Sequence, residues 1–383
     1  MWLGWALALA VASEAPTAPA TIDVVILSKH RPRALRVEGA CRASKTRGRH
    51  VSNVRELRLR GKRVRACGPR RGRKKPRCIE APKLVLQCRQ DAVLRVPGLE
   101  PRRYGRGLKV RAYKGALRLI ASVDRERYVA GVVESELRSA PREAAIAQSI
   151  LARTFAMRAA LTHRHDDAPL CDLTHCQVYA GSSSAAPSGE LAAPQVLLDR
   201  RGHVAPIFFH STCGGQTLSA RAVWGTREAP DIVGVRDVDA RGEAWCRKGS
   251  HFRWVQDVAE ADLARALDEL AGRPLDAPTL ELESTSDTGE RWVITDREGS
   301  IKASGEALHL QLSRRLGFSK VKSSAFVAQR AGGTFHLSGS GLGHRVGLCQ
   351  VGALARAGAG QSAREILEAY FPRLSLVTLG APP

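Results

Sequence analysis

The segment of residues 128–156 constrains the fold of this 383-residue chain more than any other stretch. It opens with an apolar run that is typical of a strand, and a helical pattern follows over residues 139–160. Ser139 can cap this helix, and Pro141 fits its first turn, where a missing backbone N–H costs nothing. The many alanines between the larger apolar residues predict a long helix that packs closely against its neighbours.

The rest of the chain alternates short strands and short helices without a regular strand–helix–strand repeat. A hairpin is expected over residues 108–123, with Lys114 and Gly115 at its turn. Further strands are expected at residues 21–27, 204–211, 291–295 and 335–338, and a last helix at residues 362–370. This mixture predicts the α+β class, with a small basic β-rich region ahead of a domain built on the central long helix.

The first residues have the features of a signal peptide. An apolar run covers residues 2–11, and the small residues around Val11 offer a cleavage site after Ala12. We therefore expect a signal peptide over residues 1–12, or up to about residue 20, and export to the periplasm or cell envelope. Because no Lys or Arg precedes the apolar run, an uncleaved anchor is the alternative, although the run is shorter than the roughly 20 residues that span a bilayer.

The charge balance predicts an anionic partner or surface. Sixty Lys and Arg against 37 Asp and Glu give a formal charge of +23. The basic residues concentrate in residues 31–77, inside an N-terminal region that we place at residues 21–105. In an exported protein this region would attract the anionic envelope surface. Nucleic acid is not expected as a partner, because export separates the two and no aromatic residues interleave with the basic ones.

Nine cysteines in an exported chain predict disulfides, because that compartment is oxidising. Four of them lie in the basic N-terminal region and are expected to form two disulfides there: Cys41, Cys67, Cys78 and Cys88. Because the total is odd, at least one cysteine is unpaired or bound to a metal.

Two carboxylates lie at the junction between the apolar run and the long helix, Glu134 and Glu136. A carboxyl group at such a junction can be held at the mouth of a cleft with a shifted pKa, ready for acid–base chemistry. The alternative is that both side chains cap the following helix or pair with Arg138 and Arg142.

Four separated motifs, in this order along the chain, resemble the SpoIID/LytB family, whose members act on the glycan strands of bacterial peptidoglycan. The first is GVVESEL with the later Pro141, Glu143-Ala144, Gln148 and Ala-Arg-Thr-Phe-Ala at residues 152–156. The others are CQVYAG at residues 176–181, HSTCGGQT at residues 210–217 and GLGHRVGLCQVGA at residues 341–353. The resemblance covers residues 108–372, and it implies a SpoIID-like domain over residues 108–375.

The resemblance places Glu136 at the catalytic glutamate position of a lytic transglycosylase. Glu134 replaces a small residue of the family pattern, and we expect it to be structural. Such an enzyme cleaves the MurNAc–GlcNAc bond, here in glycan stripped of stem peptides, and forms a 1,6-anhydro ring. One carboxyl group suffices, because the attacking C6 hydroxyl belongs to the substrate and no second carboxylate has to activate water. Apolar neighbours such as Val133 and Leu137 would raise the pKa of Glu136 and keep it protonated.

The family motifs also suggest which residues contact the glycan. The candidates are Arg153, Gln177, Tyr179, His210, Ser211, Gly215 and His344. For Arg153 the alternative is a core-facing salt bridge, and for His344 it is a buried histidine in a glycine-rich turn. Arg345 stands where the family motif has glycine, and it would be strained there if that position needs a positive φ.

A cluster of histidines and cysteines precedes and enters the second motif: His163, His165, Cys171, His175 and Cys176. Thiolates and imidazoles this close together on a loop suit Zn²⁺. Some family members carry a His, Cys, Cys metal site here, which favours His165, Cys171 and Cys176 as ligands of a structural zinc, with His163 and His175 as substitutes. A Cys171–Cys176 disulfide is the alternative.

Cys213 and Cys349 both replace serine in the family motifs, and Cys246 lies between them in the sequence. One disulfide is expected among the three, with Cys213–Cys246 as the favoured pair, and a second metal site is the alternative.

The resemblance leaves a second function open. LytB-like relatives are described as enhancers of a cell-wall amidase, so the chain would bind glycan strands without cutting them and assist such a partner. The replacements at Arg345 and Gln216 favour this alternative, whereas the retained Glu136 favours the enzyme.

Overall fold

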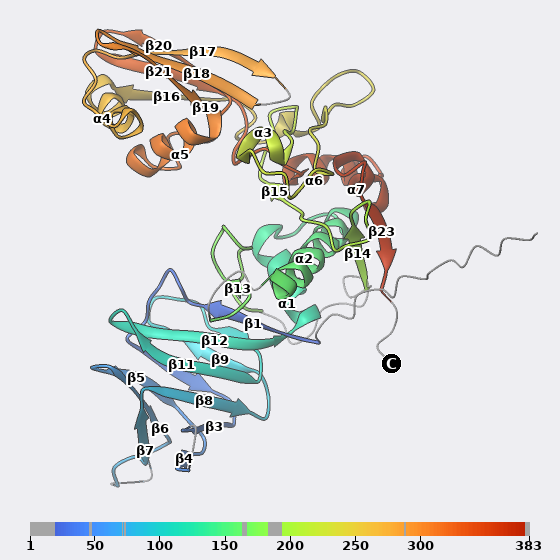
Figure 1. Ribbon diagram of the computed structural model, residues 1–383. Helices are drawn as coiled ribbons and strands as arrows, with labels where there is room; N and C mark the ends of the chain where they lie inside the picture. Colours follow the sequence, from blue (N-terminus) through green and yellow to red (C-terminus); the bar gives the residue numbers. More distant parts are fainter. Residues whose placement is uncertain are drawn as a thin grey trace, which may run out of the picture.

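The computed structural model describes residues 20–45, 48–70, 72, 74–162, 167–182, 194–286 and 289–379 (Figure 1). Helices and strands are mixed without a repeating strand–helix unit, so the predicted α+β class is confirmed. The predicted signal peptide at residues 1–12 lies outside the described residues. Among the helices of the described ranges, none is long and apolar enough to cross a membrane.

Two antiparallel-rich sheets form the N-terminal part of the molecule, drawn in blue and cyan in Figure 1. The first has the order β13-β1-β12-β11-β8-β3-β4. Its strands are β1 (Thr21–Ile26), β3 (Cys41–Ser44), β4 (His50–Val51), β8 (Lys83–Cys88), β11 (Gly107–Tyr113), β12 (Ala116–Asp124) and β13 (Leu170–Cys171). The predicted hairpin is confirmed as β11 and β12, and Lys114 and Gly115 turn the chain with φ of 45° and 78°.

The second sheet has the order β10-β9-β2-β5-β6-β7. Its strands are β2 (Ala34–Glu38), β5 (Glu56–Arg60), β6 (Arg63–Cys67), β7 (Cys78–Ala81), β9 (Ala92–Arg95) and β10 (Arg102–Tyr104). Apolar residues alternate with arginines along β5, so Leu57 and Leu59 enter the core while Arg58 and Arg60 face solvent. Because of this alternation, the basic side chains lie on the outer face of the sheet. The apolar side chains of both sheets pack into one shared core.

The two expected disulfides are present, as Cys41–Cys88 and Cys67–Cys78, and each joins paired strands. Replacing either pair with alanine is expected to lower the free energy of unfolding of this region by about 2–4 kcal/mol, because the unfolded chain regains entropy. The loss is expected to be larger for Cys41–Cys88, which spans 47 residues against 11. Hydrogen exchange of peptides from β5 and β6 measures it, and equal exchange with and without the bonds would contradict the expectation.

Two helices at the centre of the molecule carry the first motif. The apolar run predicted as a strand is the helix α1 (Arg125–Glu136), so that prediction is wrong. Asp124 caps α1 by accepting the N–H of Arg127, and Tyr128, Val129, Val132 and Val133 form one buried helical face. The long predicted helix is present as α2 (Arg142–Thr162). It begins after Ser139, which has a φ of 58° and lies in the connection between the helices.

A second core packs around α2, in the green and red parts of Figure 1. It contains α3 (Ala220–Trp224), the 3-10 helix η1 (Trp245–Lys248), α6 (Gln350–Gly358) and α7 (Ala363–Tyr370). Two strand pairs complete it: β14 (Gln195–Leu198) with β23 (Ser375–Thr378), and β15 (Phe209–His210) with β22 (Leu348–Cys349). The parallel pairing of β15 with β22 brings the third and fourth motifs side by side.

Residues 254–339 form a third core between η1 and β22, the orange part at the end of Figure 1 that lies away from the N-terminal sheets. One sheet has β16 (Trp254–Ala259), β20 (Phe326–Ala331) and β21 (Thr334–Gly339), and the other has β17 (Thr279–Ser286), β18 (Gly289–Asp296) and β19 (Gly299–Ser304). The helices α4 (Glu260–Ala271) and α5 (Gly305–Leu316) cover them. Trp292 stacks on Phe326 at 4.6 Å between ring centroids. This stretch lies between the third motif at residues 210–217 and the fourth at residues 341–353.

Candidate functional site

Glu136 is the last residue of α1, and it lies where three of the four motifs meet. Its Oε1 accepts a hydrogen bond from the backbone N–H of Val178 at 2.8 Å. Its Oε2 accepts one from the side-chain amide of Gln350, at the start of α6, at 3.3 Å. The carboxyl group is therefore oriented by two donors from distant parts of the sequence.

The surroundings of Glu136 shift its acidity. Burial raises the pKa of Glu136, and the hydrogen bonds from Val178 and Gln350 oppose that rise. Val133 of α1 and Leu137, which directly follows the helix, are both buried and supply the apolar neighbours. A half-buried carboxyl with a raised pKa and two fixed donors has the properties of a general acid that must also be stable as a carboxylate.

Glu134 lies on the same helix but has a different environment. It forms an ion pair with Arg102 of β10 at 3.3 Å, which ties α1 to the N-terminal sheets. Arg142 pairs with Glu143 instead. The ion pair is consistent with a structural role for Glu134, which stays a prediction.

The second motif holds the Val178 N–H in place. Gln177 and Tyr179 are both buried, and the hydroxyl of Tyr128 donates to Oε1 of Gln177 at 3.1 Å. A side chain on Gly131 would come within 2.6 Å of the Tyr179 ring, so only glycine allows α1 to approach this closely. Gln177 and Tyr179 therefore support the segment around Val178 from within the protein, and their side chains have almost no exposed surface that a ligand could contact.

Arg153 has the core-facing position that the sequence left as the alternative to glycan binding. Its guanidinium is fully buried and pairs with Glu126 of α1 at 2.7 Å. It also donates to the carbonyl of Gln195 at 3.0 Å. The contacts given by the structure make it a link between α1, α2 and β14.

His210 and His344 lie together, with 5.6 Å between their ring centroids. Nδ1 of His210 is 3.1 Å from the carbonyl of Val346, and burial lowers the pKa of His210 to about 3. Burial also lowers the pKa of His344 to about 4. Both imidazoles are therefore neutral at physiological pH, which suits hydrogen bonding more than ion pairing.

His344 lines a cavity of about 380 Å³ that also reaches the second motif. The walls include Phe208, Trp224 and Glu306, together with His175 and Cys176. Aromatic surfaces beside polar groups are typical of sugar-sized ligand sites. His344 lies at this cavity, and its contact with glycan stays a prediction, while Ser211 and Gly215 lie nearer the buried cysteines.

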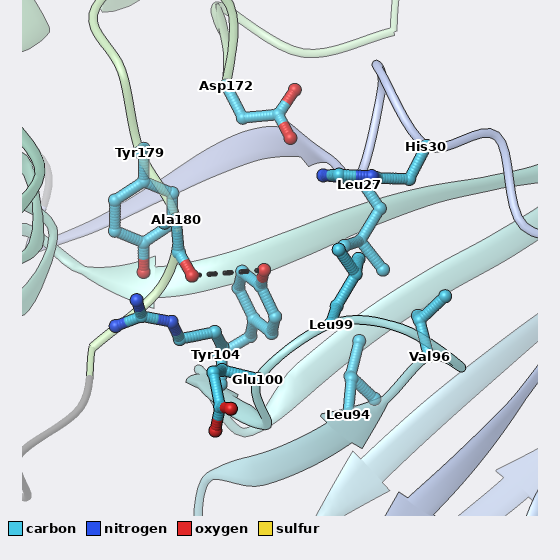
Figure 2. Close-up of a pocket in the computed structure, with 11 residues that line it drawn as sticks. Leu27, His30, Leu94, Val96, Leu99, Glu100, Tyr104, Asp172, Tyr179 and Ala180 are labelled. Carbon is cyan, nitrogen blue, oxygen red and sulfur yellow. Dashed lines mark hydrogen bonds between the residues drawn. The ribbon is translucent and has the colours of Figure 1, made fainter.

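A smaller cavity of about 200 Å³ lies between the N-terminal sheets and the second motif (Figure 2). Tyr104 and Tyr179 both face it, and the Tyr104 hydroxyl donates to the carbonyl of Ala180 at 3.2 Å. Asp172 and His30 lie on its far side. Glu136 is not among the lining residues of either cavity, so neither of them contains the candidate acid itself.

Three of the predicted metal-binding residues are described, and they converge. The sulfur of Cys171 lies 2.7 Å from that of Cys176 and 3.3 Å from Nε2 of His175. Two thiols and an imidazole are donor types that Zn²⁺ takes, and here they lie within 4.8 Å of one another. The two sulfurs would have to separate to about 3.8 Å to bind one ion. His165, the third ligand favoured from the sequence, lies outside the described residues, and His175, its named substitute, takes part in the cluster.

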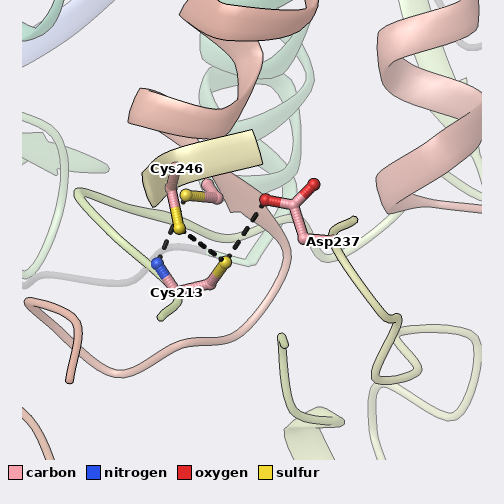
Figure 3. A group of neighbouring side chains, drawn as sticks. Cys213, Asp237 and Cys246 are labelled. Carbon is pink, nitrogen blue, oxygen red and sulfur yellow. Dashed lines mark hydrogen bonds between the residues drawn. The ribbon is translucent and has the colours of Figure 1, made fainter. Parts of the chain in front are cut away.

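The disulfide expected between Cys213 and Cys246 is absent, so that prediction is wrong. Their sulfurs are 3.5 Å apart, against about 2.05 Å in a disulfide. Cys349 and Asp237 complete a fully buried group with them, shown in part in Figure 3. Asp237 was not predicted from the sequence, because a single aspartate in a loop belongs to no recognisable pattern.

Arg345 has the backbone conformation that its motif position predicted. Its φ is 63°, in the left-handed region that favours glycine. The side chain is buried and forms an ion pair with Glu290 of β18, to which Ser324 also donates at 2.8 Å. An electrostatic contact with the third core thus accompanies the unfavourable backbone angle.

Two donors to Glu136 were missed from the sequence. Gln350 lies inside the fourth motif but was read only as part of a pattern, and the Val178 N–H is a backbone group that no residue type identifies. The side-chain amide of Gln148 is also buried, and it has no hydrogen-bond partner among the described residues.

Comparison with known proteins supports the motif resemblance. A family model described as Stage II sporulation protein matches residues 113–199. The chain is 25% identical over 283 residues to Stage II sporulation protein D of Bacillus subtilis, covering 69% of this chain and 77% of that protein. It is 26% identical over 280 residues to an uncharacterized protein of Brachyspira hyodysenteriae, covering 69% and 70%. It is also 25% identical over 289 residues to the amidase enhancer of Bacillus subtilis, covering 65% of this chain and 40% of that protein.

Proposed function

Because this chain belongs to the SpoIID/LytB family, we propose that it is a lytic transglycosylase that cleaves MurNAc–GlcNAc bonds in peptide-stripped peptidoglycan, with Glu136 as its general acid and base. The relatives support a cell-wall-related function. The observation that carries the finer proposal is the environment of Glu136, a carboxyl group with a raised pKa held by two hydrogen-bond donors.

The proposed reaction needs one carboxyl group in two protonation states. Protonated Glu136 gives its proton to the glycosidic oxygen as the bond from that oxygen to C1 of MurNAc breaks. The resulting carboxylate then takes the proton of the C6 hydroxyl while O6 bonds to C1 and closes the 1,6-anhydro ring. The Val178 N–H and the Gln350 amide stabilise the carboxylate between the two steps. The proton returns to Glu136, and no water is consumed.

Cys171, His175 and Cys176 are proposed to hold a structural Zn²⁺. The ion would fix the loop that leads into Val178, and so the donor to Glu136. These three residues fit the ion because two thiols and an imidazole lie close together. The group contains no fourth protein ligand among the described residues. A Cys171–Cys176 disulfide would hold the same loop, and a non-reducing peptide map separates the two.

A second candidate function is the non-catalytic enhancer of a cell-wall amidase. The relative named amidase enhancer favours it. In that case the chain binds glycan strands and leaves them intact. Under either proposal the protein is exported to the periplasm or cell envelope. There its basic N-terminal face adds attraction to anionic surfaces that weakens with salt.

Digestion of purified, amidase-treated peptidoglycan tests the proposal. The protein is incubated with the glycan, and soluble products are identified by mass spectrometry. Products that end in 1,6-anhydroMurNAc support the transglycosylase. Glycan that stays intact but sediments with the protein, together with faster hydrolysis by an added amidase, would overturn the enzyme and support the enhancer.

The pH dependence of cleavage follows from the raised pKa of Glu136. The acid must start protonated, so the rate is expected to be full below this pKa and to fall as the pH rises through it. Gln350→Leu removes a hydrogen bond that lowers the pKa of Glu136, so the fall should move to higher pH. Initial rates across a pH series measure the shift. A fall at the same pH in Gln350→Leu as in the wild type would show that Gln350 does not act on this carboxyl group, and a fall at lower pH would contradict the expected direction.

A further inference from the structure

Four side chains from separate segments meet in the second core, beside the candidate site and outside it. Cys213 follows β15, Asp237 lies in the loop before η1, Cys246 lies in η1, and Cys349 ends β22. Figure 3 shows the side chains of Cys213, Asp237 and Cys246 pointing toward one another. All four ligand atoms lie within 4.8 Å of one another.

The distances suit one tetrahedral ion. The sulfurs of Cys213 and Cys246 are 3.5 Å apart, and Oδ2 of Asp237 is 3.3 Å from the Cys213 sulfur. Two thiolates on one Zn²⁺ are separated by about 3.8 Å, and a thiolate and a carboxylate oxygen by about 3.5 Å, given tetrahedral angles and usual bond lengths. A small contraction or expansion of the group would therefore complete the coordination.

Asp237 has the environment of a ligand with a supporting partner. It is fully buried, and its Oδ1 accepts from Nη2 of Arg356 at 3.0 Å while its Oδ2 faces the cysteines. Metal-binding carboxylates are commonly fixed in this way through the second oxygen. Gly352 is needed for the approach, because a Cβ there would lie 2.5 Å from Oδ2 of Asp237.

The sulfurs are surrounded by donors that suit thiolates. Cys349 caps α6, and its sulfur accepts the N–H of Gly352 at 3.3 Å and that of Cys213 at 3.3 Å. The sulfur of Cys213 accepts the N–H of Gly215 at 3.3 Å. Backbone N–H groups and the positive end of a helix both stabilise negative sulfur. Three thiolates and the Asp237 carboxylate would carry four negative charges. A divalent cation would offset two of them and Arg356 a third, so the group could stay buried.

We propose that Cys213, Asp237, Cys246 and Cys349 bind a structural Zn²⁺. Three sulfurs and one oxygen in a closed, fully buried site are the donor set of a structural zinc and leave no open position for a substrate. The ion joins the third and fourth motifs to η1. It also fixes the start of α6, so Gln350 keeps its contact with Glu136.

Two measurements on the full chain, purified in the presence of zinc sulfate, test this site. The first is zinc per chain in the wild type and in Cys213→Ser/Cys349→Ser. The double variant restores the serines of the family motifs, so it is a matched control that is expected to fold. We expect it to lose one zinc per chain, while the separate Cys171 and Cys176 site keeps its metal.

The second measurement is alkylation of each cysteine with and without a chelator, read from tryptic peptides under non-reducing conditions. Cys213, Cys246 and Cys349 fall in three different tryptic peptides, so each is read independently. We expect all three to be protected until the chelator is added. In the double variant Cys246 should lose its protection. A disulfide linking two of these peptides, or equal zinc content in the wild type and the double variant, would overturn the proposal.

Discussion

Glu136→Gln is expected to lower the rate of glycan cleavage by about 10²–10⁴-fold, because the amide can neither give a proton to the leaving oxygen nor accept one from the C6 hydroxyl. The contacts of the Glu136 side chain indicate that this variant keeps the local structure. Gln keeps an oxygen that can accept from Val178 N–H, so α1 and the second motif should stay in place. The measurement is the initial rate of anhydro-product formation from amidase-treated glycan.

Glu134→Gln is the matched control for this variant. Glu134 lies two residues earlier on the same helix and pairs with Arg102, so its loss removes a partly exposed ion pair. Such pairs contribute about 0–1 kcal/mol, and the cleavage rate should change little. If both variants cleave glycan as fast as the wild type, Glu136 is not the acid. If Glu134→Gln alone is inactive, the roles of the two carboxylates are exchanged.

The fold could be predicted from the sequence where one local pattern decided the structure. The hairpin with Lys114 and Gly115 at its turn is such a case, and so is the long helix α2. The run before α2 was mistaken for a strand because apolar residues at 128, 129, 132 and 133 fit a short strand nearly as well as a helix face. Asp124 caps the N-terminus of this helix, and the prediction of a strand did not take this capping residue into account.

The candidate site could be predicted only in part, because its parts are joined by long-range contacts. The motif identified Glu136 but not its donors, since Val178 offers a backbone N–H and Gln350 is distant in sequence. The cysteine count showed that a thiol would remain, yet pairing depends on which segments meet in space. Asp237 enters the buried cysteine group from a loop, and only the packing of η1 against α6 brings it there.

Arg345→Ala is expected to lower the free energy of unfolding by about 3–5 kcal/mol, because it leaves the buried carboxylate of Glu290 without its cation. Replacement by alanine also keeps the unfavourable backbone angle, since φ at this position is 63°. Denaturant unfolding followed by tryptophan fluorescence measures the loss, and Trp292 on the same strand as Glu290 reports it.

Arg345→Gly separates the two contributions at this position. It also loses the ion pair, but glycine adopts a positive φ freely, so it should be less destabilising than Arg345→Ala by about 1 kcal/mol. Adding Glu290→Gln to Arg345→Gly removes the uncompensated charge while the Ser324 hydroxyl can still donate to the amide oxygen, so much of the stability should return. Equal unfolding of the alanine and glycine variants would show that the backbone angle costs nothing here. A double variant no more stable than Arg345→Gly would show that the ion pair does not hold the third core to the glycine-rich loop.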